Sequence, residues 1–376
     1  MKSLLPLLKA ISENKTTLNI ESISPELFQF AIDSGLASYL KHCSEDSINN
    51  EKSKYNTTLN SADLTAKILT HTQLDALDEL IRIAASEVDE VILLKGISIC
   101  QKLYPLPHIR IMSDIDLLVS EKDSKTLEGI LIDTGYKQIS ENSVEFYDQH
   151  HHSMPFYNAK NNVWLEIHTH LFSGSNPNLD DELFKIDSIF KNTVIINKEK
   201  YPINVKQLST EYQLIYTCSH WVDDLKIHKS SMQLIDMILL IKNNGAGLDW
   251  TKIFAYINNT SSASYVFLLL SYFDKYKIID VPKNYANLIK LKNSNMGIIN
   301  MSILHYIVDG FLLGKIINHK FLNENNIQII WSSLLLPSSS LKNLTRLPLN
   351  LLFPPKNTNR YKFKLFISRI KNMTKY

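Results

Sequence analysis

The amino-acid sequence predicts a mixed α/β protein of the α+β class, with helical regions on both sides of a segment of strands. Between about Asp89 and Ile203 the chain carries short apolar runs with the length and composition of strands. Before and after that segment, apolar residues recur with helical spacing. Hydrophobic residues make up 44% of the chain and charged residues 21%, so the protein can bury a sizeable core and is not disordered as a whole.

The chain length predicts more than one structural unit. At about 150 residues per domain, 376 residues correspond to two or three units. From the change in pattern we expect a helical N-terminal region, an α/β domain, a helical accessory domain and a basic C-terminal segment, at 1–88, 89–205, 206–336 and 337–376.

Individual elements follow from the periodicity. Two helices are expected in the N-terminal region, at Ile20–Ser34 and Ala62–Ala85, joined by a polar stretch. Two more lie among the strands, at Ile97–Leu103 and Ser124–Thr134, and Gly135 suits the end of the second one. The strands are expected at 91–95, 114–120, 136–140, 154–157 and 163–171. The later helices are expected at 211–221, 232–242, 250–257, 264–276 and 302–313.

Several classes of protein are excluded by the same reading. The three cysteines are far apart and form no CxxC pair, so neither a disulfide framework nor a zinc ribbon is indicated. The N-terminus does not have the pattern of a signal peptide, and no apolar stretch reaches the roughly 18 residues of a membrane span. We therefore expect a cytoplasmic protein without stable membrane insertion.

Asp114 and Asp116 are the strongest chemical signal. They are separated by one residue within an apolar strand, so both carboxylates point to the same side. Ionised neighbours of this kind repel and raise one another's pKa, so the pair needs a compensating cation. Magnesium is the natural one, because it prefers carboxylate and phosphate oxygens.

Further polar groups accompany this pair. Lys95-Gly96-Ile97-Ser98 ends a strand and opens a helix, where free N–H groups and the helix dipole favour a phosphate. Lys95 and Arg110 add cationic groups, and arginine suits bidentate phosphate contact. Fifty residues after Asp116, a strand places Glu166, His168 and His170 on one side at period-two spacing.

These residues resemble the DNA polymerase β-type nucleotidyltransferase superfamily, with Asp-apolar-Asp on one strand and a third carboxylate on a later one. The chain is more closely similar to a bacterial family called uncharacterised nucleotidyltransferases. The likeness runs from about Glu90 to Leu171, through LKG, LYP, Arg110, SDIDLLV, TGY, the histidine run with MPF, and LEIHTHL. It continues through SHW at 219–221 and LIDMILLI at 234–241. It implies the minimal nucleotidyltransferase fold, a short mixed sheet flanked by helices that binds an NTP and two metal ions.

The resemblance also implies roles. Asp114 and Asp116 would be the metal-bridging carboxylates, and Glu166 would bind the catalytic metal and help to activate the acceptor hydroxyl. Gly96 and Ser98 would match the phosphate-cradling turn, although this chain has Ile97 where the superfamily usually has Gly or Ser. The accessory helices would shape the choice of acceptor.

Histidines near these positions are candidates for acceptor-side contacts. His150, His151 and His152 are adjacent and no cysteine completes the set, so the sequence favours a substrate-side or supporting contact, with His152 as the candidate, over a zinc site, and a solvated loop stays open. The other candidates for acceptor or supporting contacts are His168, His220 and Asp236.

The sequence thus predicts a Mg²⁺-dependent enzyme, with Mn²⁺ as an alternative ion, that moves an NMP from an NTP to an acceptor and releases pyrophosphate. ATP is the expected donor, and the acceptor could be a small molecule, a protein or RNA. A degenerate nucleotide-binding or partner-binding protein and, less favoured, a glycosyltransferase with an Asp-x-Asp motif stay open. The segment 337–376 carries nine basic and no acidic residues, which fits either a packed terminal helix or an anionic surface contact.

Overall fold

The structure is a computed structural model of the chain. It describes residues 3–44, 54–140, 147, 150–172, 182–196, 199–223, 230–244, 247–258 and 260–290, with 302, 305, 306, 308–310, 312 and 313. The basic segment 337–376 and part of the helix expected at 302–313 lie outside these residues.

A seven-stranded mixed sheet forms the centre of the fold, with the strand order β3-β4-β5-β2-β1-β7-β6. Strand β1 pairs parallel with β7 and β2 pairs parallel with β5, while the other pairs are antiparallel. This confirms the predicted α/β class, and all five expected strands are present in shorter form. The strands are Glu90–Leu93 (β1), Ile115–Leu118 (β2), Lys137–Gln138 (β3), Phe156–Asn158 (β4), Val163–His168 (β5), Thr193–Ile195 (β6) and Asn204–Leu208 (β7).

Strands β6 and β7 were not predicted from the sequence. Strand β7 has the sequence NVKQL, in which only Val205 and Leu208 are apolar and buried. Its place beside β1 is set by long-range pairing, with Glu90 opposite Asn204. Strand formation depends on such neighbours more than on local preference, so a short polar strand leaves little signal in the sequence.

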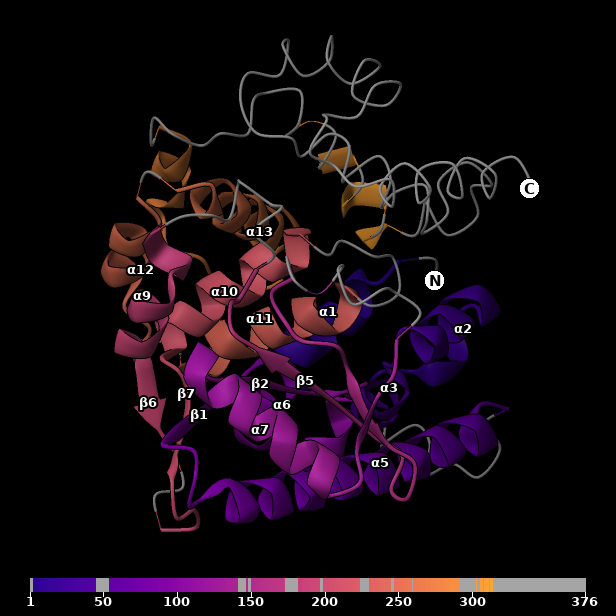
Figure 1. The fold of residues 1–376 in the computed structure, drawn as a ribbon. Coiled ribbons are helices and arrows are strands. Elements are labelled where there is room, and N and C mark those ends of the chain that lie inside the picture. Colours follow the sequence, from indigo (N-terminus) through magenta and orange to yellow (C-terminus); the bar gives the residue numbers. More distant parts are fainter. Residues whose placement is uncertain are drawn as a thin grey trace, which may run out of the picture.

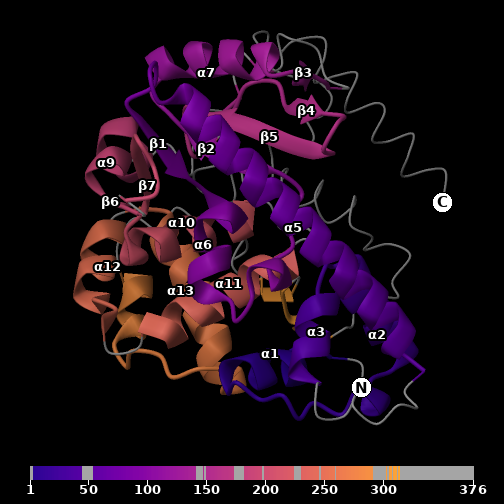
Figure 2. The same ribbon diagram turned by 90° about the horizontal axis from the view of Figure 1, so that it is seen from below.

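Side chains of the central strands alternate between two hydrophobic clusters, one on each face of the sheet. Val91 and Leu93 pack with the C-terminal half of α5 (Asn56–Ala84) and with α7 (Glu121–Asp133). Ile92 and Leu118 instead belong to the cluster that contains the later helices and one side of α6 (Lys95–Leu103), with Ile99 and Leu103. Figures 1 and 2 show α5 and α7 on the side of the sheet away from α10 to α13. Asp116 points to the same face of the sheet as Leu118, the face that carries the later helices, because it lies two residues before Leu118 on β2.

Helices from both ends of the described chain join this second cluster. Leu8 and Tyr39 pack in it together with Ile238 and Leu269, although more than 190 residues separate the two pairs. The backbone N–H of Leu4 also donates to the carbonyl of Leu312 at 3.1 Å. The early helices are α1 (Leu5–Ser12), α2 (Pro25–Asp33) and α3 (Ala37–Cys43), with a 3₁₀ turn at Ile20–Ser22. The later ones are α9 (Ile186–Lys191), α10 (Thr210–Asp223), α11 (Ser230–Asn244), α12 (Trp250–Ile257) and α13 (Ser262–Tyr276), with 3₁₀ turns at Pro107–Ile109, Glu182–Phe184 and Tyr285–Lys290.

Local sequence accounts for the helix ends. Ser120 caps α7 by accepting the backbone N–H of Asp123 at 3.1 Å, and Ser24 caps α2 in the same way through Leu27. After α7 the chain reverses at Gly135, whose φ of 93° is a conformation that side chains disfavour. No helix in the described part of the chain is both long and apolar enough to cross a membrane.

A buried ion pair fastens the α/β part to α11. Arg110 donates from Nε and Nη2 to Asp236 at 2.9 Å, and Asp236 also accepts from the Tyr104 hydroxyl. Asp236 is 2% exposed and Arg110 9%. Burial raises the pKa of Asp236, and the neighbouring guanidinium opposes that rise. The pair therefore fixes the chain just before Asp114 against the helices.

Replacing one partner of this pair should destabilise the fold. Asp236→Ala leaves the Arg110 guanidinium buried without its counter-charge, which costs about 3–5 kcal/mol. We expect a large fall in the urea midpoint, largely restored in the apolar double variant Arg110→Met, Asp236→Leu. Glu182→Gln, which breaks an exposed pair with Lys185, is the matched control and should leave the midpoint nearly unchanged. An unaltered midpoint in Asp236→Ala would refute the role of the pair.

Candidate functional site

The parallel pairing of β2 with β5 brings two carboxylates side by side. Asp116 lies opposite Glu166 in the register, and Leu118 lies opposite His168. Neighbouring residues of paired strands point to the same face, and residues two apart along a strand do as well. The structure therefore places Asp116, Glu166 and His168 together on the face that carries the later helices, and Asp114 precedes them on the same side.

Asp116 is the buried centre of this group. Its Oδ1 accepts from Lys95 Nζ at 2.6 Å and from His168 Nε2 at 2.8 Å. Burial alone would raise the pKa of Asp116, but the Lys95 charge and the His168 hydrogen bond outweigh it and hold the pKa well below its usual range. Likewise, burial would lower the pKa of Lys95, and the Asp116 charge raises it instead. Both groups are therefore charged at neutral pH.

Asp114 and Glu166 add two further carboxylates. Burial, followed by the charges of Asp116 and Glu166, raises the pKa of Asp114 to about 6, against the opposing charge of Lys95. Burial also acts to raise the pKa of Glu166, but the contact with His168 leaves it below the usual value. Glu166 Oε2 lies 3.6 Å from Nε2 of both His152 and His168. Three carboxylates thus lie near one lysine, and repulsion from Asp116 and Glu166 adds to the effect of burial on the pKa of Asp114.

The donor atoms fit a divalent cation. One ligand atom from each of Asp116, Glu166 and His168 can be chosen so that all lie within 4.8 Å of one another. Lys95 and His168 both use Oδ1 of Asp116, which leaves Oδ2 for an ion. Carboxylate oxygens are the ligands that Mg²⁺ and Mn²⁺ prefer, and the uncompensated charge favours such an ion.

The turn after β1 has an unusual backbone. Lys95 has a φ of 47°, a left-handed conformation that is uncommon for a residue with a side chain and is often found at functional sites. Next to it, a Cβ on Gly96 would lie 2.6 Å from Cγ of Met112 and 3.4 Å from Cζ of Arg110. Gly96 is therefore needed for the close packing of α6 against the segment that leads to Asp114.

A pocket of about 620 Å³ opens over the carboxylates. Lys95, Gly96 and Arg110 line it, whereas Ser98 is 6% exposed and is not among the lining residues. Arg110 directs its guanidinium to Asp236. The phosphate contacts expected of Arg110 and Ser98 stay predictions. Asp236 itself is held by Arg110 and Tyr104 and does not line the pocket.

The far wall of the pocket comes from elements distant in the sequence. His220 is one of the residues of this wall, and its Nδ1 lies 2.8 Å from Nε2 of Gln233, while its contact with an acceptor stays a prediction. The sequence did not single out the other residues of this wall, because nothing in their type or spacing points to chemistry. They are Asp33, Ser34 and Gly35 at the end of α2, Leu171 and Phe172 after β5, and Met232 and Gln233 on α11.

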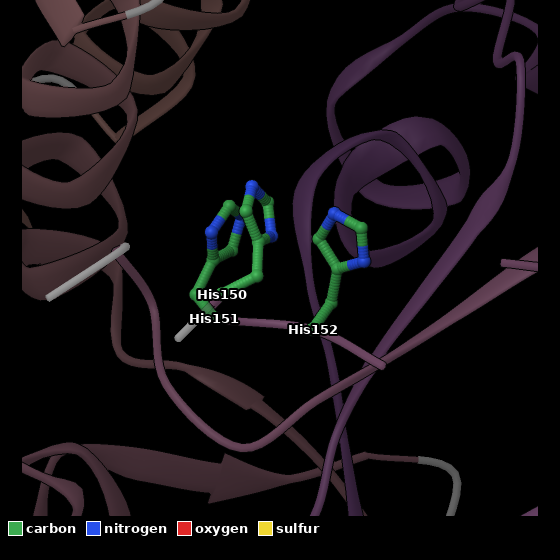
Figure 3. A group of neighbouring side chains, drawn as sticks. All are labelled: His150, His151 and His152. Atoms are coloured by element: carbon green, nitrogen blue, oxygen red, sulfur yellow. The ribbon is translucent and has the colours of Figure 1, made fainter. Parts of the chain in front are cut away.

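His150, His151 and His152 line the same pocket. Figure 3 shows their rings close together, and the ring centroids are 4.3 to 4.8 Å apart. Burial, with a smaller effect of His152, lowers the pKa of His150 to about 4, and burial also lowers the pKa of His151 and His152. These imidazoles are therefore neutral at pH 7.

The packing at Gly96 can be tested without knowledge of the substrate. Gly96→Ala should displace Met112 and the segment before Asp114, and we expect at least a tenfold loss in the affinity for Mn²⁺ and NTP, measured by isothermal titration calorimetry. Adding Met112→Ala removes the clash and should restore most of the affinity. Gly129→Ala on α7, where a Cβ meets nothing within 4 Å, is the control. Equal affinity of Gly96→Ala and the wild type would show that the close approach is unimportant.

Comparison with known proteins shows the family of the chain. No curated protein and no solved structure matches the chain. A family model described as uncharacterised nucleotidyltransferase matches residues 24–276, which include every strand of the sheet and the helices α2 to α13. This confirms the family that the sequence resembles. The chain therefore belongs to the uncharacterised nucleotidyltransferase family.

Proposed function

We propose that the protein is a metal-dependent nucleotidyltransferase that moves an NMP from an NTP, with ATP as the expected donor, to an acceptor hydroxyl. The observation that carries this proposal is the juxtaposition of Asp114, Asp116 and Glu166 around the Lys95 ammonium at the floor of a pocket. Membership of a nucleotidyltransferase family supports it.

The reaction would proceed by displacement at the α-phosphorus. An acceptor oxygen forms a bond to that phosphorus, the bond to the bridging oxygen breaks, and pyrophosphate leaves. Bound Mg²⁺ or Mn²⁺, held by Asp114, Asp116 and Glu166, would neutralise the phosphates and the attacking oxygen. Glu166 lines the pocket, where an acceptor hydroxyl could give up its proton to it.

The chain's own residues would hold the reactants in place. Lys95 fixes one oxygen of Asp116, so that the carboxylate presents the other oxygen in a single orientation. The turn at Gly96 opens α6 beside the same pocket, where backbone N–H groups favour a phosphate. The wall that contains His220 and Gln233 would receive the acceptor or the base of the nucleotide. Most of the catalysis would come from positioning and charge neutralisation.

A turnover assay tests the proposal. The purified protein is incubated with each of the four NTPs, Mg²⁺ or Mn²⁺, and cell extract separated into small-molecule, RNA and protein fractions. The expected result is a mass gain of one NMP in one fraction, with release of pyrophosphate. Absence of product in all fractions, together with no metal-dependent NTP binding, would favour a degenerate binding protein of the same fold.

Loss of either aspartate should abolish this activity. Asp114→Asn and Asp116→Asn each preserve the shape of the side chain but remove a charge needed to hold the ions, so we expect product formation to fall by at least about 10³-fold. Pyrophosphate release, measured by a coupled assay, gives the rate. Asp75→Asn, at an exposed position on α5, is the matched control and should retain full activity. Turnover by Asp116→Asn near the wild-type rate would contradict the assignment.

Metal affinity should depend on pH through Asp114. Its pKa is raised to about 6, so the carboxyl group becomes protonated as the pH falls through 6 and competes with the ion. The affinity for Mn²⁺, measured by electron paramagnetic resonance of the free ion, should be constant above pH 7 and fall about tenfold per unit below pH 6. Asp114→Asn should bind weakly and lose this dependence between pH 7 and 5. A flat profile in the wild type would contradict the role of Asp114.

A further inference from the structure

Three imidazole rings converge on the edge of the pocket, at His150, His151 and His152 (Figure 3). Each offers one ring nitrogen, and the three nitrogens lie within 4.8 Å of one another. The reaction proposed above gives no task to His150 or His151. Their convergence therefore calls for a different explanation.

The backbone explains how adjacent residues bring their rings together. In an extended strand, neighbouring side chains point to opposite faces, so adjacent residues rarely share a ligand. Here the chain turns at His150, whose N–H donates to the carbonyl of Tyr147 at 3.1 Å. The carbonyl of His151 then accepts from the N–H of Thr169 at 3.1 Å, and His152 forms an antiparallel bridge with His168. The turn is thereby fastened to the end of β5.

The ring nitrogens have the properties of metal ligands. His152 donates from Nδ1 to the carbonyl of Ser153 at 2.7 Å, which fixes its tautomer and leaves a lone pair on Nε2, 3.6 Å from Oε2 of Glu166. Among the described residues, Nδ1 of His151 is buried and finds no hydrogen-bond partner. A buried polar atom without a partner is costly, and an ion would satisfy it.

We propose that His150, His151 and His152 bind one divalent transition-metal ion of the class that prefers imidazole, with Zn²⁺ as its representative. In a tetrahedral zinc site with bonds of about 2.0–2.1 Å, ligand nitrogens are about 3.3 Å apart, so the rings need to approach by about 1.5 Å at most. The fourth position would face the pocket and take a water or a substrate oxygen. The carboxylates of Asp114, Asp116 and Glu166 prefer a harder ion such as Mg²⁺, so the two sites select different metals. This site does not depend on the proposed nucleotidyl transfer.

Cobalt substitution tests the site in the full-length protein. After treatment with a chelator, the protein is titrated with Co²⁺ and followed by visible absorption. We expect one equivalent to bind at micromolar concentration or below, with the intense bands of tetrahedral cobalt. Zn²⁺ should displace it, and excess Mg²⁺ should not. Weak bands of octahedral cobalt alone would overturn the proposal.

Variants locate the ion. His150→Ala, His151→Ala should weaken cobalt binding by about 100-fold or more, because two ligands are lost. Asp116→Asn should retain the tetrahedral spectrum, which separates this site from the carboxylates and from the fate of the proposed function. His71→Ala, at an exposed histidine on α5, controls for the loss of an imidazole and should bind as the wild type does. Unchanged binding by the double histidine variant, or loss of the tetrahedral spectrum in Asp116→Asn, would contradict the proposal.

A measurement on the wild type avoids any effect of the substitutions on folding. X-ray absorption of the protein loaded with one equivalent of Zn²⁺ should show about three imidazole nitrogens at about 2.0 Å. A shell made only of oxygen atoms would overturn the assignment.

Discussion

The buried ion pair between Lys95 and Asp116 is the interaction on which the site depends. A carboxylate in the interior is costly unless it is paired and hydrogen-bonded, and Asp116 is 2% exposed. Lys95 Nζ at 2.6 Å and His168 Nε2 at 2.8 Å stabilise its charge. Asp114 and Glu166 lie near the same lysine, and burial together with the charges of Asp116 and Glu166 raises the pKa of Asp114. Carboxylates that lie this close together favour a bound cation.

The fold serves to hold this arrangement. The parallel register of β2 and β5 sets Asp116 beside Glu166, and the turn after β1 supplies Lys95. Helices from both ends of the described chain pack over the same face of the sheet in one hydrophobic cluster. The pair Arg110–Asp236 then ties the segment before Asp114 to α11. The accessory helices thus form part of the pocket wall as well as part of the core.

Local patterns predicted the features that depend on local geometry. The period-two spacing correctly placed Asp116 on one side of its strand and Glu166 and His168 on one side of theirs, and apolar runs located five of the strands. Local spacing could not predict contacts between residues that are far apart in the sequence. Arg110, for which a phosphate contact stays a prediction, also forms an ion pair with Asp236, 126 residues away, and no spacing rule connects the two. The turn that gathers three adjacent histidines is another such case, because it is fixed by hydrogen bonds to the end of β5.

The central claim is that the carboxylates around Asp116 bind the metal that carries an NTP. Anomalous diffraction from crystals grown with Mn²⁺ and a non-hydrolysable ATP analogue tests it most directly. We expect anomalous peaks in contact with Asp114, Asp116 and Glu166, with the triphosphate lying beside the turn at Gly96. A bound analogue whose manganese lies elsewhere, with no peak at these three carboxylates, would contradict it.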